Sequence, residues 1–116
     1  MEKNQGMLKS PFGIVGLETA ASLTYTELVL KGILTPLQMA EKMSYNPANV
    51  LRVDVGSIAE GKSADIVIFN PDVTYVIDRN TFVSKGKNTP FDGRKVTGLV
   101  EKTIIDGEIV YEFIEE

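Results

Sequence analysis

The fold of this chain is decided by a loop that leads directly into a helix, Ser10-Pro11-Phe12-Gly13-Ile14-Val15-Gly16-Leu17-Glu18-Thr19-Ala20. Two glycines shape the loop, and helical spacing of apolar residues begins after the second. A junction of this kind presents backbone N–H groups and the positive end of a helix dipole to an anion. The stretch therefore predicts a helix that begins near Leu17, with an anion-accessible loop before it.

The front of the chain is predicted to be helical. Small and apolar side chains share one helical face over Leu17–Lys31, and Gly32 follows where a left-handed cap is needed. Thr35-Pro36-Leu37-Gln38 has the pattern of a capping box, which starts a second helix that we expect to stop near Ser44. Asn46-Pro47 repeats the cap-then-proline pattern and predicts a short third helix.

The rest of the chain is predicted to be extended. The run Ala64-Asp65-Ile66-Val67-Ile68-Phe69 is typical of a buried strand, and Asn70-Pro71-Asp72 should end it. Alternating apolar residues at 73, 75 and 77 predict a second strand. Asp106-Gly107, between two further apolar runs, predicts a hairpin with a type I′ turn. The polar stretch Ser84–Arg94 is expected to form a long loop of the kind that often has a function.

Composition excludes several classes of function. The 116 residues are too few for a complete eight-stranded barrel, which needs roughly 250. A net charge of -4 argues against nucleic acid and against an anionic membrane surface as partners. No apolar run approaches the roughly 20 residues of a membrane span. The chain lacks cysteine and a recognisable leader, which predicts a reducing cytoplasm.

Three blocks resemble one family, the dihydroorotases, which are metal-dependent hydrolases of the amidohydrolase superfamily. Residues Gly13–Ala20 are similar to the loop and helix after the last barrel strand of that family. Residues Asp54–Phe69 resemble the segment by which many amidohydrolases enter their small β domain, and this block does not separate hydantoinases, allantoinases and dihydroorotases. Ser84–Gly93 resembles the dihydroorotase form of a loop that allantoinases carry altered, so it favours dihydroorotase.

The resemblance implies an α+β fold of two parts. Residues 1–52 would be the C-terminal helical end of a (β/α)8 barrel, and residues 53–116 the C-terminal part of a small β-sandwich domain. In the family, strands from the other end of the chain complete that sandwich. Open sheet edges at Ile66–Phe69 and Ile104-Ile105, and an apolar face on the first helix without a barrel beneath it, would then need covering. We therefore expect a homo-oligomer.

The resemblance also implies a mechanism and a substrate contact. The family uses a binuclear zinc site of histidines, a carboxylated lysine and an aspartate to interconvert carbamoyl aspartate and dihydroorotate. This chain has no histidine or cysteine, and the family's Asp-His segment would lie just before its first residue, so no bound zinc is expected. The family's Phe-Gly backbone contact with dihydroorotate corresponds to Phe12 and Gly13, with Pro11 shaping the approach. No catalytic residue is predicted.

Other charged residues have ordinary structural interpretations. Glu18 near a helix start is favourable to the helix dipole. Asp54 and Asp65 fit turns and strand ends better than a metal site, because they lack histidine neighbours. Lys85 and Lys87 are typical of a solvated loop.

Two functional hypotheses from different classes remain. The first is a piece of a dihydroorotase that is inactive by itself and needs an N-terminal barrel portion, with a related allantoinase or hydantoinase as a variant of this hypothesis. The second is a non-catalytic module that keeps the amidohydrolase scaffold for self-association or for docking to another enzyme.

Overall fold

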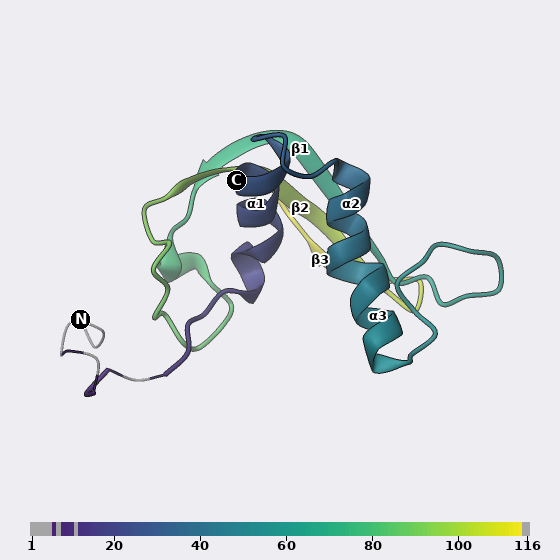
Figure 1. Cartoon of the computed structure of the whole chain (residues 1–116), viewed down its shortest axis with the longest axis horizontal. Coiled ribbons are helices and arrows are strands. Elements are labelled where there is room, and N and C mark those ends of the chain that lie inside the picture. The colour runs from purple at the N-terminus through teal and green to yellow at the C-terminus, as the bar shows by residue number, and fades with distance from the viewer. Residues whose placement is uncertain (1–5, 7, 11, 115–116) are drawn as a thin grey trace.

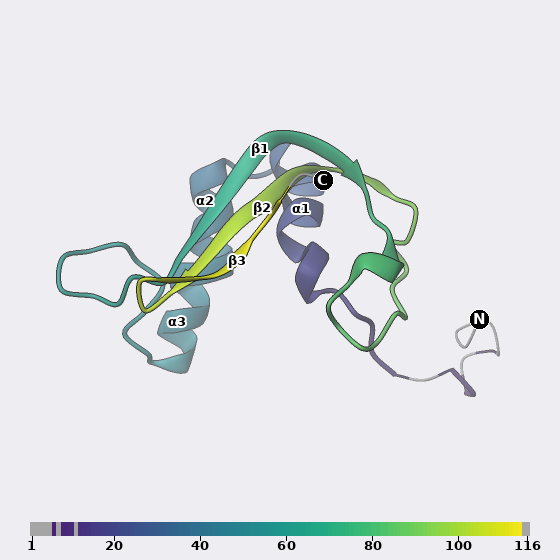
Figure 2. The ribbon, with the colours of Figure 1, turned by 180° about the vertical axis from the view of Figure 1, so that it is seen from behind.

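The computed structural model describes residues 6, 8–10 and 12–114. Across these residues the chain forms a helical front and a single antiparallel sheet of three strands in the order β1-β2-β3. The strands are β1 (Ile66–Val76), β2 (Lys95–Ile105) and β3 (Glu108–Glu112). Both views show the helices on one face of the sheet (Figures 1 and 2). The expected α+β class is confirmed.

The first helix runs continuously from Leu17 to Val29. It consists of a 3-10 turn (η2, Leu17–Thr19), α1 (Ala20–Thr24) and a π-helical turn (η3, Tyr25–Val29). Gly32 follows with a φ of +70°, and its N–H donates to the carbonyl of Val29 at 2.9 Å. The predicted helix and its glycine cap are therefore confirmed.

The second helix begins at the predicted capping box. The Gln38 N–H donates to the Thr35 hydroxyl at 3.2 Å, and the Thr35 N–H donates to the Gln38 side-chain oxygen at 2.8 Å. These two bonds satisfy donors that the first helical turn leaves unpaired. The helix comprises α2 (Pro36–Ala40), a π-helical turn (η4, Glu41–Tyr45) and α3 (Asn46–Leu51).

The predicted stop at Ser44 and the separate third helix are wrong, because α3 continues the second helix. Tyr45 and Asn46 both have right-handed helical dihedral angles, and Asn46 makes no side-chain cap in this part of the structure. Pro47 would clash with the carbonyl four residues earlier in a regular α-helix. The π-helical turn before it loosens that spacing, so the helix passes through the proline and ends at Arg52, whose φ is +56°.

Strand β1 joins two segments that the sequence predicts as separate strands. Its pairing with β2 shifts between Ile68 and Phe69 and again between Asn70 and Thr74. Asn70-Pro71-Asp72 forms a bulge rather than a strand end, and the Asp72 N–H donates to the Asn70 side-chain oxygen at 3.0 Å. A bulge tolerates proline because no ladder hydrogen bond is required there. The strand is also only partly covered, since Val67 and Ile68 are exposed.

The hairpin between β2 and β3 agrees with the prediction. Ile105 pairs with Glu108, and the two turn residues have positive φ angles, +50° for Asp106 and +84° for Gly107. These are the angles of a type I′ turn. The expectation of an open edge at Ile104-Ile105 is wrong, because β2 lies between β1 and β3 in the described sheet. Ile66–Phe69 does lie on an edge strand.

The first helix packs against β2. The expectation that its apolar face has nothing beneath it is therefore wrong. The rings of Tyr25 and Phe69 meet edge to face with centroids 5.3 Å apart, and the Phe69 ring lies over Gly98 of β2. The most buried large side chains, Ile77 and Val96, are each 1% exposed. The aromatic contact of Tyr25 with Phe69 therefore joins the helix to the sheet.

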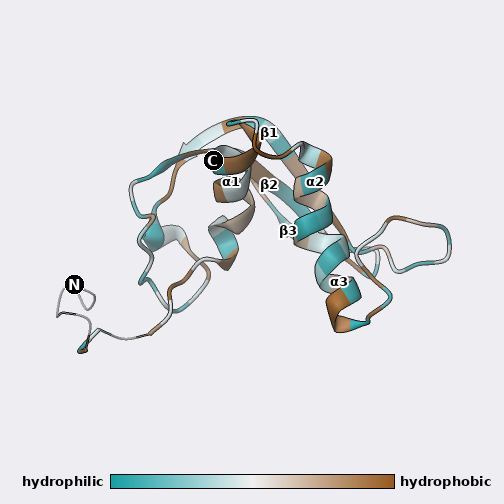
Figure 3. Cartoon of the chain, in the orientation of Figure 1, coloured by the Kyte–Doolittle hydropathy of each residue, from teal (hydrophilic) through white to brown (hydrophobic). Residues whose placement is uncertain are grey.

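Large apolar side chains also remain on the surface. On the second helix Leu37 is 80% exposed and Val50 81%, and Figure 3 shows hydrophobic colour at the end of α3. Beyond β3, Ile114 is 78% exposed. In the described part of the chain, no helix has the length and apolar character needed to cross a bilayer.

Candidate functional site

The predicted substrate contact lies on an open part of the surface. Phe12 is fully exposed, and Gly13 has a φ of +77°, a conformation that favours glycine. A Cβ built on Gly13 would meet no atom within 4 Å, so protein packing does not exclude a side chain there. Glycine is needed for the backbone conformation, and the space beside it is open to a ligand. Pro11 lies outside the described residues.

Two loops that are far apart in sequence lie side by side at this site. The Asn88 side-chain N–H donates to the Gly13 carbonyl at 3.2 Å, and the Val15 N–H donates to the Asn88 carbonyl at 3.3 Å. A Cβ added to Gly86 would lie 2.8 Å from Cγ2 of Val15, so the Gly86 backbone lies close against the Val15 side chain. The predicted loop after Ser84 is thus held against the loop that precedes the first helix.

Glu18 joins the same two loops at their other end. Its carboxylate accepts the N–H of Val83 at 2.9 Å on one oxygen and the N–H of Ser84 at 3.0 Å on the other. A hydrogen bond from the Ser84 side chain lowers the pKa of Glu18 most, and the two backbone N–H groups and the charge of Lys87 lower it further, against desolvation. Glu18 therefore has a more specific role than that of a helix-dipole partner.

Backbone hydrogen bonds close the base of the second loop. The Ile77 N–H donates to the Arg94 carbonyl at 2.9 Å, and the Gly93 N–H donates to the Ile77 carbonyl at 2.8 Å. Asp92 accepts the Arg79 N–H at 3.0 Å and pairs with the Arg79 guanidinium at 3.3 Å. The loop is consequently anchored both at its base and at its contact with residues 13–18.

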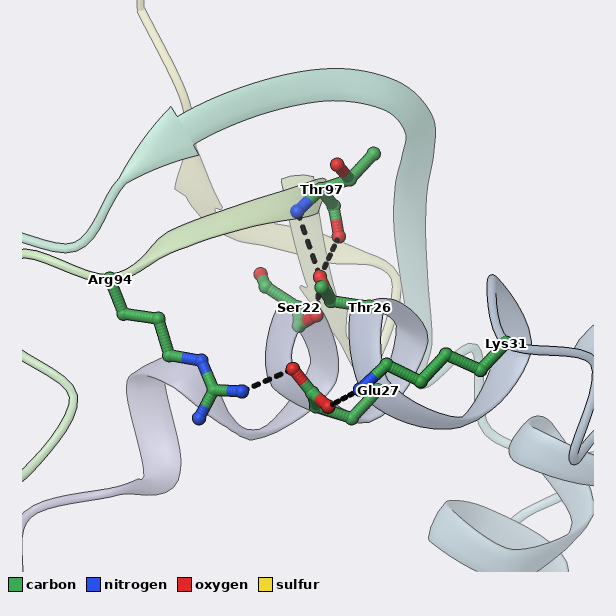
Figure 4. Close-up of polar contacts among 6 residues, drawn as sticks. All are labelled: Ser22, Thr26, Glu27, Lys31, Arg94 and Thr97. Carbon is green, nitrogen blue, oxygen red and sulfur yellow. Dashed lines mark hydrogen bonds and ion pairs between the residues drawn. The ribbon is translucent and has the colours of Figure 1, made fainter.

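A polar cluster positions the first helix on β2 (Figure 4). The Thr26 hydroxyl accepts the Thr97 N–H at 2.8 Å and donates to the Ser22 carbonyl at 2.7 Å. The Tyr75 hydroxyl donates to the Ser22 hydroxyl at 2.9 Å. Sequence reasoning missed this interface, although hydroxyl residues at 19, 22 and 26 recur at helical spacing and were a usable signal.

Arg94 connects the loop to the same helix. Its guanidinium pairs with Glu27, which also pairs with Lys31 one turn further along (Figure 4). The Lys31 hydrogen bond lowers the pKa of Glu27 most, and the Arg94 charge and hydrogen bond lower it as well, against desolvation. All three side chains retain solvent exposure, so solvent screens these pairs.

The two aspartates weighed as metal ligands lie outside helices and strands, Asp54 at a bend and Asp65 directly before β1. Asp54 pairs with Lys62 in the loop before the sheet. Asp65 accepts the Asp106 N–H at 2.9 Å, which ties the start of β1 to the hairpin turn. Lys87 donates to the carbonyl of Phe82 at 2.6 Å. This arrangement agrees with the ordinary interpretation of the two aspartates.

The donor set does not fit a binuclear zinc centre. Within residues 6, 8–10 and 12–114, no three His, Cys, Asp or Glu side chains come together as a metal site. The whole chain has no histidine, the ligand type that such centres use most. These residues therefore do not supply the ligands of such a centre.

Comparison with known proteins gives the class to which the fold and site belong. Residues 3–110 match the sequence profile of the amidohydrolase family. The chain belongs to the amidohydrolase family.

Individual relatives show which members of the amidohydrolase family this chain is similar to. The chain is 52% identical over 101 residues to a dihydroorotase of Pelotomaculum thermopropionicum, covering 87% of this chain and 24% of that protein. It is 48% identical over 110 residues to a dihydroorotase of Clostridioides difficile, covering 95% of this chain and 26% of that protein. An L-hydantoinase structure from Arthrobacter aurescens superposes with a TM-score of 0.85 at 34% identity, covering 90% of this chain and 24% of that one. The chain thus spans about a quarter of the length of the curated relatives it matches.

Proposed function

We propose that this chain is the C-terminal part of a dihydroorotase, a cyclic amide hydrolase that interconverts N-carbamoyl-aspartate and dihydroorotate. The observation that carries the proposal is the contact between residues 13–18 and 83–88. The contact joins two of the three blocks whose sequences resemble dihydroorotases, Gly13–Ala20 and Ser84–Gly93, into one surface beside Gly13. The identity of 48% to 52% with dihydroorotases supports the same conclusion.

Within that enzyme, we assign residues 1–52 to the helical end of a barrel and residues 53–116 to part of a β-sandwich. Exposed apolar side chains such as Leu37, Val50 and Ile114 support this assignment, because proteins rarely leave many of them uncovered. The chain would be inactive alone, since its residues do not fit the zinc centre of dihydroorotases. A cytoplasmic location and self-association remain part of the proposal.

The chain's own contribution is substrate positioning. Phe12 and Gly13 would meet dihydroorotate through their backbone, and the open space beside Gly13 allows a close approach. The positive φ of Gly13 orients that backbone, and Asn88 holds its carbonyl. Positioning of this kind contributes binding energy for dihydroorotate and does not itself activate water.

Complementation tests the proposal. The portion of the Clostridioides difficile dihydroorotase that precedes its similarity to this chain is expressed alone and together with the chain. We expect zinc-dependent turnover of dihydroorotate from the pair and none from either piece. The matched control is the same N-terminal portion paired with its own C-terminal part. An active control beside an inactive mixed pair would overturn the proposal.

A hydantoinase is the second candidate, favoured by the TM-score of 0.85 with L-hydantoinase. The complemented pair is offered hydantoin, dihydrouracil and allantoin beside dihydroorotate. The dihydroorotase proposal predicts a preference for dihydroorotate, because the loop after Ser84 favours that family over allantoinases. A preference for hydantoin would favour the second candidate.

A further inference from the structure

The two loops beside Gly13 form an antiparallel pair. We call residues 13–18 and 83–88 the paired loops. Contacts join Gly13 to Asn88, Val15 to Gly86 and Glu18 to Val83, so the two loops run in opposite directions. Figure 1 shows the two segments together at the end of the molecule away from α3. Their separation of 65 to 75 residues in sequence makes this a tertiary contact.

Side chains hold both ends of the pair. Glu18 uses its two carboxylate oxygens separately, one for the N–H of Val83 and one for the N–H of Ser84. Asn88 uses its side-chain N–H for the Gly13 carbonyl. Hydrogen bonds to a charged acceptor are stronger than neutral ones, so Glu18 is the firmer of the two attachments.

We propose that Glu18 and Asn88 are positioning residues that hold the Gly13 backbone in its substrate-contacting conformation, with Glu18 acting through the loop that carries Asn88. The proposal rests on the proposed function for the identity of the substrate. Neither side chain needs to touch that substrate. A φ of +77°, as at Gly13, is one of several backbone conformations open to glycine. The hydrogen bond from Asn88 to the Gly13 carbonyl favours this one.

Amide NMR of the 116-residue chain tests directly whether Glu18 and Asn88 hold the Gly13 backbone. Glu18→Gln leaves one carbonyl oxygen for two N–H donors, and Asn88→Asp replaces the donor with an oxygen of the same shape. We expect each variant to shift the amide signals of Gly13 and Val15. Glu60→Gln, at an exposed loop residue, is the matched control and should leave them unchanged. Unchanged Gly13 and Val15 signals in Glu18→Gln would overturn the proposal.

A kinetic test uses the complemented enzyme. Preorganisation of a binding loop acts equally on ground state and transition state, so its loss raises KM and leaves kcat unchanged. Loss of one hydrogen bond predicts a rise of about fivefold in KM for dihydroorotate with Glu18→Gln or Asn88→Asp. A fall in kcat at constant KM would contradict a positioning role. The dihydroorotase proposal fails if the N-terminal portion is inactive with the unsubstituted chain but active with its own C-terminal part. The NMR result then still decides whether Glu18 and Asn88 hold Gly13.

Discussion

Gly98 is the position where a single methyl group should damage the fold most clearly. It lies in β2 with a φ of +97°, opposite the bulge of β1. A Cβ there would be 2.2 Å from Cζ of Phe69, whereas carbon atoms in contact prefer about 3.5–4.0 Å. The ring would have to move by about 1 Å or more, and Tyr25 packs against it edge to face. Gly98→Ala therefore strains both the backbone and the helix–sheet contact.

The structure allows the two costs to be separated. A left-handed conformation costs an L-residue about 1–2 kcal/mol, and overpacking costs about 1–3 kcal/mol. Gly98→Ala should lower the free energy of unfolding by about 2–5 kcal/mol, the sum of both. Gly107→Ala is the matched control, because Gly107 has a φ of +84° and a Cβ there would meet nothing within 4 Å. Its cost should be about 1–2 kcal/mol.

Urea unfolding followed by circular dichroism measures Gly98→Ala, Gly107→Ala, Phe69→Leu and the double variant Gly98→Ala/Phe69→Leu. The smaller leucine should relieve part of the overlap, so the two changes together should cost less than their sum. Equal costs for Gly98→Ala and Gly107→Ala, or strict additivity in the double variant, would refute the reasoning from the Phe69 contact.

Four further results are expected. Thr26→Val leaves a β2 amide without its acceptor and should cost about 1–3 kcal/mol in unfolding free energy, while Thr24→Val in the same helix should cost less. Because the pKa of Glu18 is lowered in the folded chain, its contribution is complete above the ordinary value of 4.5 and is lost as pH falls through the lowered value. Protection factors of Val83 and Ser84 should therefore fall in acid and stay constant near neutrality. Dialysis of the isolated chain against zinc, followed by elemental analysis, should leave less than one zinc per chain; a tightly held stoichiometric zinc would contradict the analysis of the donor set. Light scattering over a dilution series should show a dimer or larger species that covers exposed apolar side chains, and a monomer at every concentration would contradict this.

Sequence motifs predicted the structure correctly where all of the residues that form the motif lie within a few positions of one another. The Thr35 capping box and the Asp106-Gly107 turn formed as predicted, because each needs only its own side chains and dihedral angles. Two other proline motifs gave wrong predictions. Asn46-Pro47 does not begin a separate helix, and Asn70-Pro71-Asp72 does not end a strand. A π-helical turn and a bulge accommodate these prolines, so the helix and the strand continue past them.

Residue patterns alone were enough to predict the α+β class of the chain, its helical front, its hairpin and the family resemblance of its three blocks. That resemblance also placed Phe12 and Gly13 beside a proposed substrate, an assignment that stays a prediction. The partners of Glu18 and Asn88 could be found only in the folded chain, because they lie 65 to 75 positions away in sequence. Spacing along a chain defines neighbours on one helix or strand, whereas contacts between distant loops depend on how the helix packs on the sheet. That packing follows from Phe69 over Gly98 and from Thr26 on β2, and it brings the two loops together.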